Sequence, residues 1–169
     1  MKKILLCWLA AATALTAGAQ SNEWQDAGVN AVNRMPMHGS WFAYESPEAA
    51  QTGDKTLSER FVTLNGNWKF NWVRDADQRP TDFFRVGYND TMPVPGIWEL
   101  NGYGDPVYLN VGYAWRGWFK NDPPHVPVEQ NHVGSYRRTV DIPAAWAGRQ
   151  IVAHFGSVTS NIYRWVNGR

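Results

Sequence analysis

The sequence feature that most constrains the fold of this chain is a set of short runs in which apolar and polar residues alternate. Turn-forming residues separate these runs. The clearest run, residues 67–73, places three aromatic side chains on one face, where we expect them in the core, and polar side chains on the other. Similar alternation is present at residues 136–142 and 150–155, and residues 161–166 form a further strand-like stretch. Patterns with the period of an amphipathic helix are scarce. The chain is therefore predicted to be an all-β sandwich of short strands.

Two Asn-Gly pairs mark positions where hairpin turns are expected. This pair is favoured in two-residue hairpins because both turn positions need a positive φ. Asn65-Gly66 would join residues 61–64 to the strand that follows, and Asn167-Gly168 would begin a second hairpin whose return strand the sequence does not contain. We therefore predict a C-terminally truncated domain, in which residues 162–166 present an unpaired strand edge. A frayed C-terminal turn is the alternative.

The residues before the first strand signal form an irregular N-terminal arm, residues 20–57. Within this arm, Ser46 as N-cap and Pro47 at the first helical position predict one helical turn. Further along, two prolines predict an extended backbone over residues 92–98.

The first 19 residues have the organisation of a removable signal peptide. Lys2 and Lys3 form a positive n-region, residues 4–15 are apolar, and Ala17-Gly18-Ala19 fits a cleavage site. The apolar run is shorter than a bilayer-spanning helix requires, which disfavours the alternative of a membrane anchor. We expect export with a mature chain that starts near Gln20, and the periplasm is the predicted location.

Cysteine content and net charge further limit the chemistry and the binding partners that this protein can have. The single cysteine, Cys7, lies inside the signal peptide, so the mature chain is predicted to have no disulfide and no thiol chemistry. Without Lys2 and Lys3 the 16 basic residues fall to 14, against 15 acidic residues. A nearly neutral chain gives no electrostatic reason to expect nucleic acid or an anionic membrane as a partner.

Residues 98–138 are rich in aromatic residues, prolines and glycines and poor in aliphatic side chains. Flat rings with polar tips on a proline-stiffened loop suit a ligand that has apolar faces and hydroxyl edges. Sugars have this chemistry, and the segment therefore favours a carbohydrate as the substrate class.

Several motifs in this order resemble the N-terminal part of glycoside hydrolase family 2, in particular the large β-galactosidases. The resemblance covers most of the mature chain. Its motifs are Asn22-Glu23-Trp24, Asn33-Arg34, Leu64-Asn65-Gly66-Asn67-Trp68-Lys69-Phe70, Val94-Pro95-Gly96-Ile97-Trp98, Tyr108-Leu109-Asn110-Val111-Gly112-Tyr113, Pro123-Pro124-His125-Val126-Pro127, Gly134-Ser135-Tyr136-Arg137-Arg138, Phe155-Gly156-Ser157-Val158-Thr159-Ser160 and Trp165-Val166-Asn167-Gly168-Arg169.

The resemblance implies a jelly-roll sugar-binding domain of the galactose-binding type at residues 58–169, left incomplete. An immunoglobulin-like domain and a TIM barrel would follow it. It also implies retaining hydrolysis by two glutamates of the barrel, so no glutamate of this chain is assigned a catalytic role. By resemblance the full-length enzyme uses Mg²⁺ and Na⁺, with ligands elsewhere. Its expected partners are a β-galactoside substrate, its own downstream barrel and, as one possibility, further copies of itself.

The same resemblance points to one short stretch as the sugar contact. Asn110 matches the family position that reaches into the galactose subsite, and its amide can both donate to and accept from hydroxyl groups. Val111 beside it would supply backbone or a van der Waals wall. The alternative for Asn110 is a loop-capping role. Residues 114–120 depart from the family pattern as an insertion, and Trp115 and Trp118 would form an aromatic rim, with packing against a neighbouring domain as the equal alternative.

No metal-site motif is found, and two rival functions stay open. The four histidines have no zinc-type spacing, so no metal site is predicted in this chain. Another family 2 activity, β-glucuronidase or β-mannosidase, is the nearest rival. A non-catalytic glycan-binding module is the rival from another class.

Overall fold

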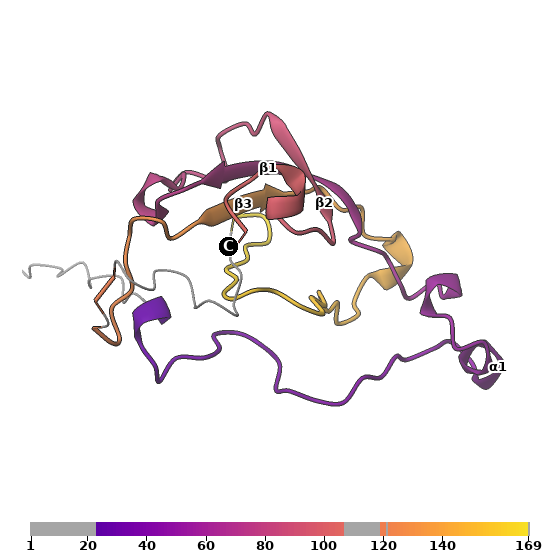
Figure 1. Ribbon diagram of the computed structural model, residues 1–169. Coiled ribbons are helices and arrows are strands. Elements are labelled where there is room, and N and C mark those ends of the chain that lie inside the picture. Colours follow the sequence, from indigo (N-terminus) through magenta and orange to yellow (C-terminus); the bar gives the residue numbers. More distant parts are fainter. Residues whose placement is uncertain (1–22, 107–118, 121, 169) are drawn as a thin grey trace, which may run out of the picture.

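The computed structural model describes residues 23–106, 119–120 and 122–168. Its centre is a three-stranded antiparallel sheet with the strand order β2-β1-β3 (Figure 1). The strands are β1 (Gly66–Val73), β2 (Asp90–Val94) and β3 (Val133–Arg137). Short helices lie between and around them: η1 (Glu23–Gln25), α1 (Pro47–Gln51), η2 (Lys55–Leu57), η3 (Ala76–Gln78), η4 (Glu99–Asn101) and η6 (Ala144–Trp146).

This architecture confirms the all-β prediction. The second sheet of a jelly-roll sandwich is not found among the described strands, so that finer prediction stays a prediction. The predicted signal peptide, residues 1–19, lies outside the described residues. Within the ranges given above, no helix is long and apolar enough to cross a membrane.

Strand β1 is central because both of its edges are hydrogen-bonded. Phe70 lies opposite Asp90 of β2 on one side and opposite Tyr136 of β3 on the other. Strand β2 is at the edge of this sheet, which is where a proline such as Pro93 is tolerated, since it cannot donate to a second ladder. The extended backbone predicted for residues 92–98 is therefore correct up to Val94, after which the chain leaves the sheet.

The core lies on the aromatic face of β1. The register places Trp68, Phe70 and Trp72 on the same face as Met92 and Tyr136. Phe70 and Met92 are almost completely buried, with 1% and 0% of their surfaces exposed. The prediction that this face belongs to the core is thus confirmed at Phe70, while the two tryptophans are only partly buried.

Residues 95–104 fold back over this face and close the core. The Tyr103 ring packs edge-on against Phe70 at 4.8 Å between centroids, and Trp98 lies 6.3 Å from the same ring. Trp98 also donates from Nε1 to the Tyr136 hydroxyl at 2.5 Å. Gly134 of β3 leaves room for this arrangement, because a Cβ there would lie 2.5 Å from a Trp98 ring carbon.

The hairpin predicted at Asn65-Gly66 is wrong. Residues 61–65 are not in a strand, and both edges of β1 are occupied by β2 and β3, so no third partner can pair there. Gly66 has a φ of 126°, but Asn65 is not among the residues with positive φ, and a type I′ turn needs both. The chain instead enters β1 directly, and Trp68 Nε1 donates back to the Leu64 carbonyl at 2.8 Å.

The strand predicted at residues 136–142 begins and ends earlier, as β3. Arg137 pairs with Lys69, and beyond it the backbone ladder stops. There Arg138 donates from Nη1 to the Leu64 and Asn65 carbonyls at 2.7 and 2.8 Å, so its side chain replaces the next strand pairing.

The strands predicted at residues 150–155 and 161–166 are also wrong. Both segments are exposed and unpaired, and a strand forms only where a neighbour accepts its backbone hydrogen bonds. Asn167 and Gly168 nevertheless adopt the positive φ values that their turn-forming pair predicts, 53° and 79°. Figure 1 shows this C-terminal segment in yellow beneath the sheet.

The N-terminal arm runs as an extended trace below the sheet, from η1 to α1 (Figure 1). The helical turn predicted there is confirmed: Ser46 Oγ accepts from the Ala49 amide at 3.2 Å, and Pro47 opens α1. Just before α1, Glu45 ties the arm to the residues that follow it: its Oε1 accepts from Ser58 Oγ at 2.5 Å and from the Arg60 amide at 3.1 Å.

These bonds make the arm sensitive to acid. The hydrogen bond from Ser58, followed by backbone contacts and the nearby Arg60 charge, lowers the pKa of Glu45 below its usual 4.5. Because the pKa of Glu45 is lower in the folded state than in the unfolded state, its ionised carboxylate stabilises the arm at pH values above the unfolded-state pKa. This stabilisation is lost as the pH falls through the folded-state pKa. Protection of the Arg60 amide from hydrogen exchange, corrected for intrinsic rates, should therefore fall as the pH drops below about 4.5. In a Glu45→Gln variant the corrected protection should not change with pH, and an unchanged wild-type profile would contradict this assignment.

Candidate functional site

The residues predicted to contact sugar, Asn110 and Val111, and the predicted rim residues, Trp115 and Trp118, lie outside the described residues. The structure does describe the chain on both sides of this stretch. Both sides lead to the same place, the C-terminal end of β1, and the contacts made there define the candidate site.

The chain before the stretch is fixed by aromatic packing. After η4, Gly102 adopts a left-handed conformation with a φ of 85°, and the Tyr103 amide donates to the Trp98 carbonyl at 3.1 Å. The Tyr103 ring then contacts Phe70 and lies 6.3 Å from the ring of Trp72. Burial, and next the Asp90 carboxylate, raise the pKa of the Tyr103 hydroxyl, so it stays protonated throughout the neutral range. This side therefore meets β1 through a rigid, uncharged contact.

Gly104 brings the backbone close to β1. A Cβ at this position would lie 3.3 Å from the His132 ring and 3.4 Å from the Trp72 ring, and its φ of 74° favours glycine. The rings of Trp72 and His132 are themselves 4.9 Å apart. The two sides of the predicted sugar-binding stretch thus meet across Trp72.

The chain after the stretch is fixed by backbone and amide hydrogen bonds. Its turn at Asp122 is closed by the His125 amide, which donates to the Asp122 carbonyl at 2.8 Å. The Val128 carbonyl accepts from the Ala76 amide at 3.0 Å, and Asn131 Nδ2 donates to the Pro127 carbonyl at 3.0 Å. The Ala76–Val128 bond attaches the returning chain to the start of η3, shortly after β1, and the other two bonds close turns within the returning chain.

Four polar residues connect the two sides, and we call them the Arg74 network: Arg74, Asp75, Asp105 and Gln130. Arg74 Nη1 donates to Gln130 Oε1 at 2.9 Å and lies 3.7 Å from Asp105 Oδ2. Asp75 Oδ1 accepts from the Gln130 amide at 2.8 Å. Sequence reasoning missed this network, because its partners are up to 56 residues apart and no motif marks them.

Three polar atoms near the sheet are buried and have no hydrogen-bond partner in the described part of the chain: Trp72 Nε1, His132 Nε2 and Arg137 Nη2. Such groups are uncommon in folded proteins, since an unpaired buried donor costs about 1–3 kcal/mol. Arg137 is partly compensated, because its guanidinium lies 4.7 Å from the centre of the Tyr88 ring. The other two lie at the candidate site.

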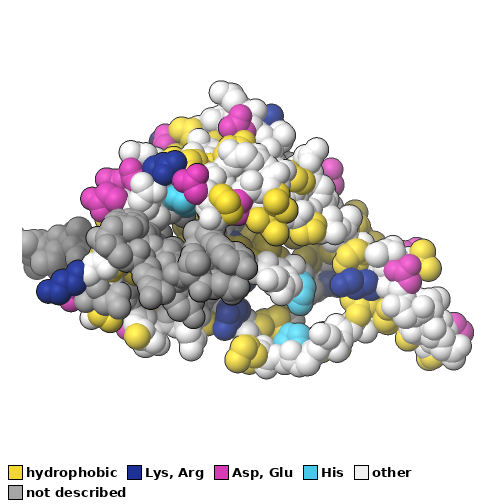
Figure 2. Space-filling model, in the orientation of Figure 1, with side chains coloured by type: hydrophobic (Ala, Val, Ile, Leu, Met, Phe, Trp, Pro, Cys, Tyr) yellow, Lys and Arg dark blue, Asp and Glu magenta, His cyan; other side chains and the backbone are white. Residues whose placement is uncertain are grey.

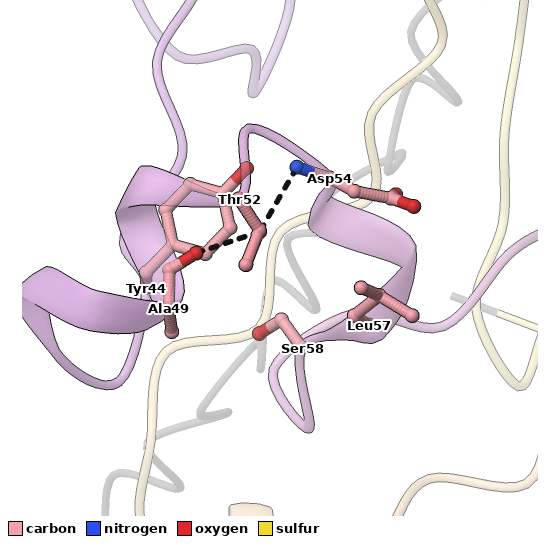
Figure 3. A pocket seen from close by; sticks show the side chains of 6 residues that line it. All are labelled: Tyr44, Ala49, Thr52, Asp54, Leu57 and Ser58. Carbon is pink, nitrogen blue, oxygen red and sulfur yellow. Dashed lines mark hydrogen bonds between the residues drawn. The ribbon is translucent and has the colours of Figure 1, made fainter.

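A small pocket in the N-terminal arm is a less suitable site (Figure 3). It measures about 200 Å³, and its lining residues are Tyr44, Ala49, Thr52, Asp54, Leu57 and Ser58. Ligand sites usually enclose about 300–1,000 Å³. The polar side chains of Thr52 and Asp54 are already used: Thr52 Oγ1 donates to the Ala49 carbonyl at 2.7 Å and accepts from the Asp54 amide, and Asp54 caps η2.

Two carboxylates of the arm, those of Glu45 and Glu48, differ from what acid catalysis requires. The general acid of a glycosidase needs a raised pKa. Hydrogen bonds from Ser58 and from Ser46 instead lower the pKa values of Glu45 and Glu48. Within the described ranges, no group of three or more histidine, cysteine, aspartate or glutamate side chains could hold a metal ion.

Comparison with known proteins shows the family to which the chain belongs. Residues 61–169 match the family described as "Glycosyl hydrolases family 2, sugar binding domain". The matched range contains all three strands and both sides of the candidate site.

Curated relatives extend the similarity into the N-terminal arm. A β-galactosidase of Halalkalibacterium halodurans is 37% identical over 148 residues, which is 85% of this chain and 14% of the relative. A β-galactosidase of Priestia megaterium is 34% identical over 81% of the chain and 14% of its own length. The β-galactosidase large subunit of Leuconostoc lactis is 32% identical over 86% of the chain and 25% of its own length.

The chain thus spans between about a seventh and a quarter of the length of these relatives. The family match covers the sheet and both segments of the candidate site. It therefore accounts for the fold and for the aromatic-rich segment together. This chain belongs to family 2 of the glycosyl hydrolases and contains residues of that family's sugar-binding domain.

Proposed function

We propose that the complete protein is a β-galactosidase that removes terminal non-reducing β-D-galactose residues with retention of configuration. The observation that carries this proposal is the 32–37% identity to β-galactosidases over more than four-fifths of the chain. Retention requires two carboxyl groups about 5–5.5 Å apart. We place both in a downstream barrel, as the resemblance to family 2 implies, and we assign no glutamate of this chain a catalytic role.

In this proposal the chain completes one wall of the substrate pocket. Asn110 would orient the galactose by hydrogen bonds to its hydroxyl groups, with Val111 beside it and Trp115 and Trp118 at the rim. The partly buried aromatic side chains at the end of β1 support this role, since the segments before and after the predicted sugar-binding stretch pack against them. The Mg²⁺ and Na⁺ that the resemblance implies find no ligand cluster among the described residues, and we derive no step through either ion.

A panel of aryl β-glycosides assayed on the complete protein tests the proposal. We expect cleavage of the galactoside, with β-galactose as the first product in proton NMR. Residues 20–169 alone, assayed in parallel, should show no hydrolysis, because the two carboxyl groups would be missing. Cleavage of the glucuronide or mannoside in place of the galactoside would assign a different activity of the family. Binding of galactosides without any cleavage by the complete protein would identify a glycan-binding module.

A further inference from the structure

The sequence contains three Asn-Gly pairs, Asn65-Gly66, Asn101-Gly102 and Asn167-Gly168. In such a pair the backbone nitrogen of glycine can attack the side-chain amide carbon of asparagine, because glycine has no Cβ to hinder the approach. We infer that Asn167 is a site of spontaneous deamidation in this protein, and that local hydrogen bonds protect the other two asparagines. The sequence ranks the three pairs equally, and only their structural surroundings separate them.

The reaction needs only water as a co-reactant. The glycine nitrogen forms a bond to Cγ of the asparagine and gives its proton to solvent, and Nδ2 takes up a proton and leaves as ammonia. Water then opens the cyclic imide at either carbonyl, which yields aspartate or isoaspartate. No electron is transferred, and the product is a carboxylate that is ionised at neutral pH. Because the nucleophile is the deprotonated amide, the rate should rise with pH.

The surroundings of Asn167 leave this reaction unhindered. Both Asn167 and Gly168 are exposed, and they adopt φ values of 53° and 79°. Val166 before them is 69% exposed. Within the part of the chain that the structure describes, neither residue of the pair makes a hydrogen bond. The Asn167 side chain can therefore turn toward the Gly168 nitrogen without breaking one.

The pair at Asn101 is held through the side chain of its asparagine. Asn101 Nδ2 donates to the Ile97 carbonyl at 2.8 Å, and the Asn101 amide donates to the Trp98 carbonyl at 2.8 Å. The first bond fixes the side chain that must rotate before the Gly102 nitrogen can reach it. A hydrogen bond that must break first should slow the reaction about 5-fold, the factor that corresponds to its usual net contribution.

The pair at Asn65 is held through its backbone. The Asn65 amide donates to Thr63 Oγ1 at 3.1 Å, and the Asn65 carbonyl accepts from Arg138 Nη1 at 2.8 Å. Gly66 begins β1 and is paired with β2. Formation of the cyclic imide rotates the peptide group between Asn65 and Gly66, so it must disturb these contacts. We therefore expect Asn65 to be protected as well.

Incubation of the complete protein in a mildly alkaline buffer made with oxygen-18-labelled water tests the inference. Mass spectrometry of peptide digests gives the rate at each asparagine, because every hydrolysed imide takes up a labelled oxygen, and an isoaspartyl methyltransferase assay identifies the isoaspartate. We expect Asn167 to react at least about 5-fold faster than Asn65 or Asn101. In an Asn167→Gln control the signal should be lost, because the longer side chain would have to close a larger, less favourable ring.

Two further variants test the structural reason for the difference. Thr63→Val removes the acceptor of the Asn65 amide, and Arg138→Met removes the donor to the Asn65 carbonyl. Each should raise the rate at Asn65 about 5-fold and leave the rate at Asn167 unchanged. Thr63 is exposed, so Thr63→Val keeps the test decisive where Arg138→Met fails to fold.

Three results overturn the inference: no deamidation at Asn167, a rate at Asn167 no higher than at Asn65 or Asn101, or an unchanged rate at Asn65 in Thr63→Val. Hydrolysis of glycosides plays no part in these measurements, so their outcome is independent of the proposed function.

Discussion

A Phe70→Ala variant is expected to lose about 3–5 kcal/mol of folding free energy from the sheet, the range measured for buried aromatic residues. Phe70 lies in the central strand with 1% of its surface exposed. Its ring contacts the Tyr103 and Tyr136 rings at 4.8 and 4.7 Å between centroids, and Trp98 lies near. The three rings come from two other segments of the chain, so they cannot close together over the space that alanine would leave.

Native-state hydrogen exchange of the β1 amides in the complete protein measures this loss, because exchange reports local unfolding in a multidomain chain. Phe84→Ala is the matched control, since Phe84 is 51% exposed and should cost less than about 1 kcal/mol. Equal effects of the two substitutions would mean that Phe70 is not the centre of the core.

A Gly134→Ala variant is expected to lose about 3 kcal/mol, the upper end of the usual cost of overpacking. The added Cβ would lie 2.5 Å from one Trp98 ring carbon and 2.9 Å from a Phe70 ring carbon. Neither ring can retreat easily: Trp98 is held by its bond to the Tyr136 hydroxyl, and Phe70 is surrounded on the core side. The variant must therefore shift Trp98 or separate β3 from β1.

The same exchange measurement applies, with Gly87→Ala as the control, because nothing lies within 4 Å of a Cβ added there. A second substitution separates crowding from other causes. Trp98→Leu removes the ring atoms that meet the new methyl group, so it should cost less in the Gly134→Ala background than in the wild type. Additive losses in the double variant would show that the close approach is not what makes glycine necessary.

Exposed hydrophobic side chains outside the core show what the described sheet leaves uncovered. Figure 2 shows hydrophobic side chains gathered on several parts of one face, and the large exposed ones include Trp41, Leu57, Ile97, Leu100 and Val166. Among the described residues only Phe70, Tyr88 and Met92 are buried hydrophobic side chains. The core at Phe70 therefore carries a large share of the stability that the described residues supply.

The candidate site could be predicted only in part. The aromatic-rich segment and its sugar-type chemistry are readable in the sequence, and the family comparison agrees with them. The Arg74 network is not readable, because an arginine after a strand has no pattern that points to a glutamine 56 residues later. Only the sheet brings β1 and β3 side by side, and this pairing places the segments before η3 and before β3 next to each other.

The sequence alone determined the features that depend on neighbouring residues. Residues 67–73 alternate, and they form β1 with Phe70 facing the core; Ser46 and Pro47 begin α1, as capping chemistry requires. The two Asn-Gly pairs show that neighbouring residues do not always decide the backbone conformation. Asn167-Gly168 adopts positive φ at both residues, whereas Asn65 does not, because the following strand has both edges filled by more distant partners. Strand pairing is a competition among segments far apart in the chain, and only the tertiary structure decides which of them bond to β1.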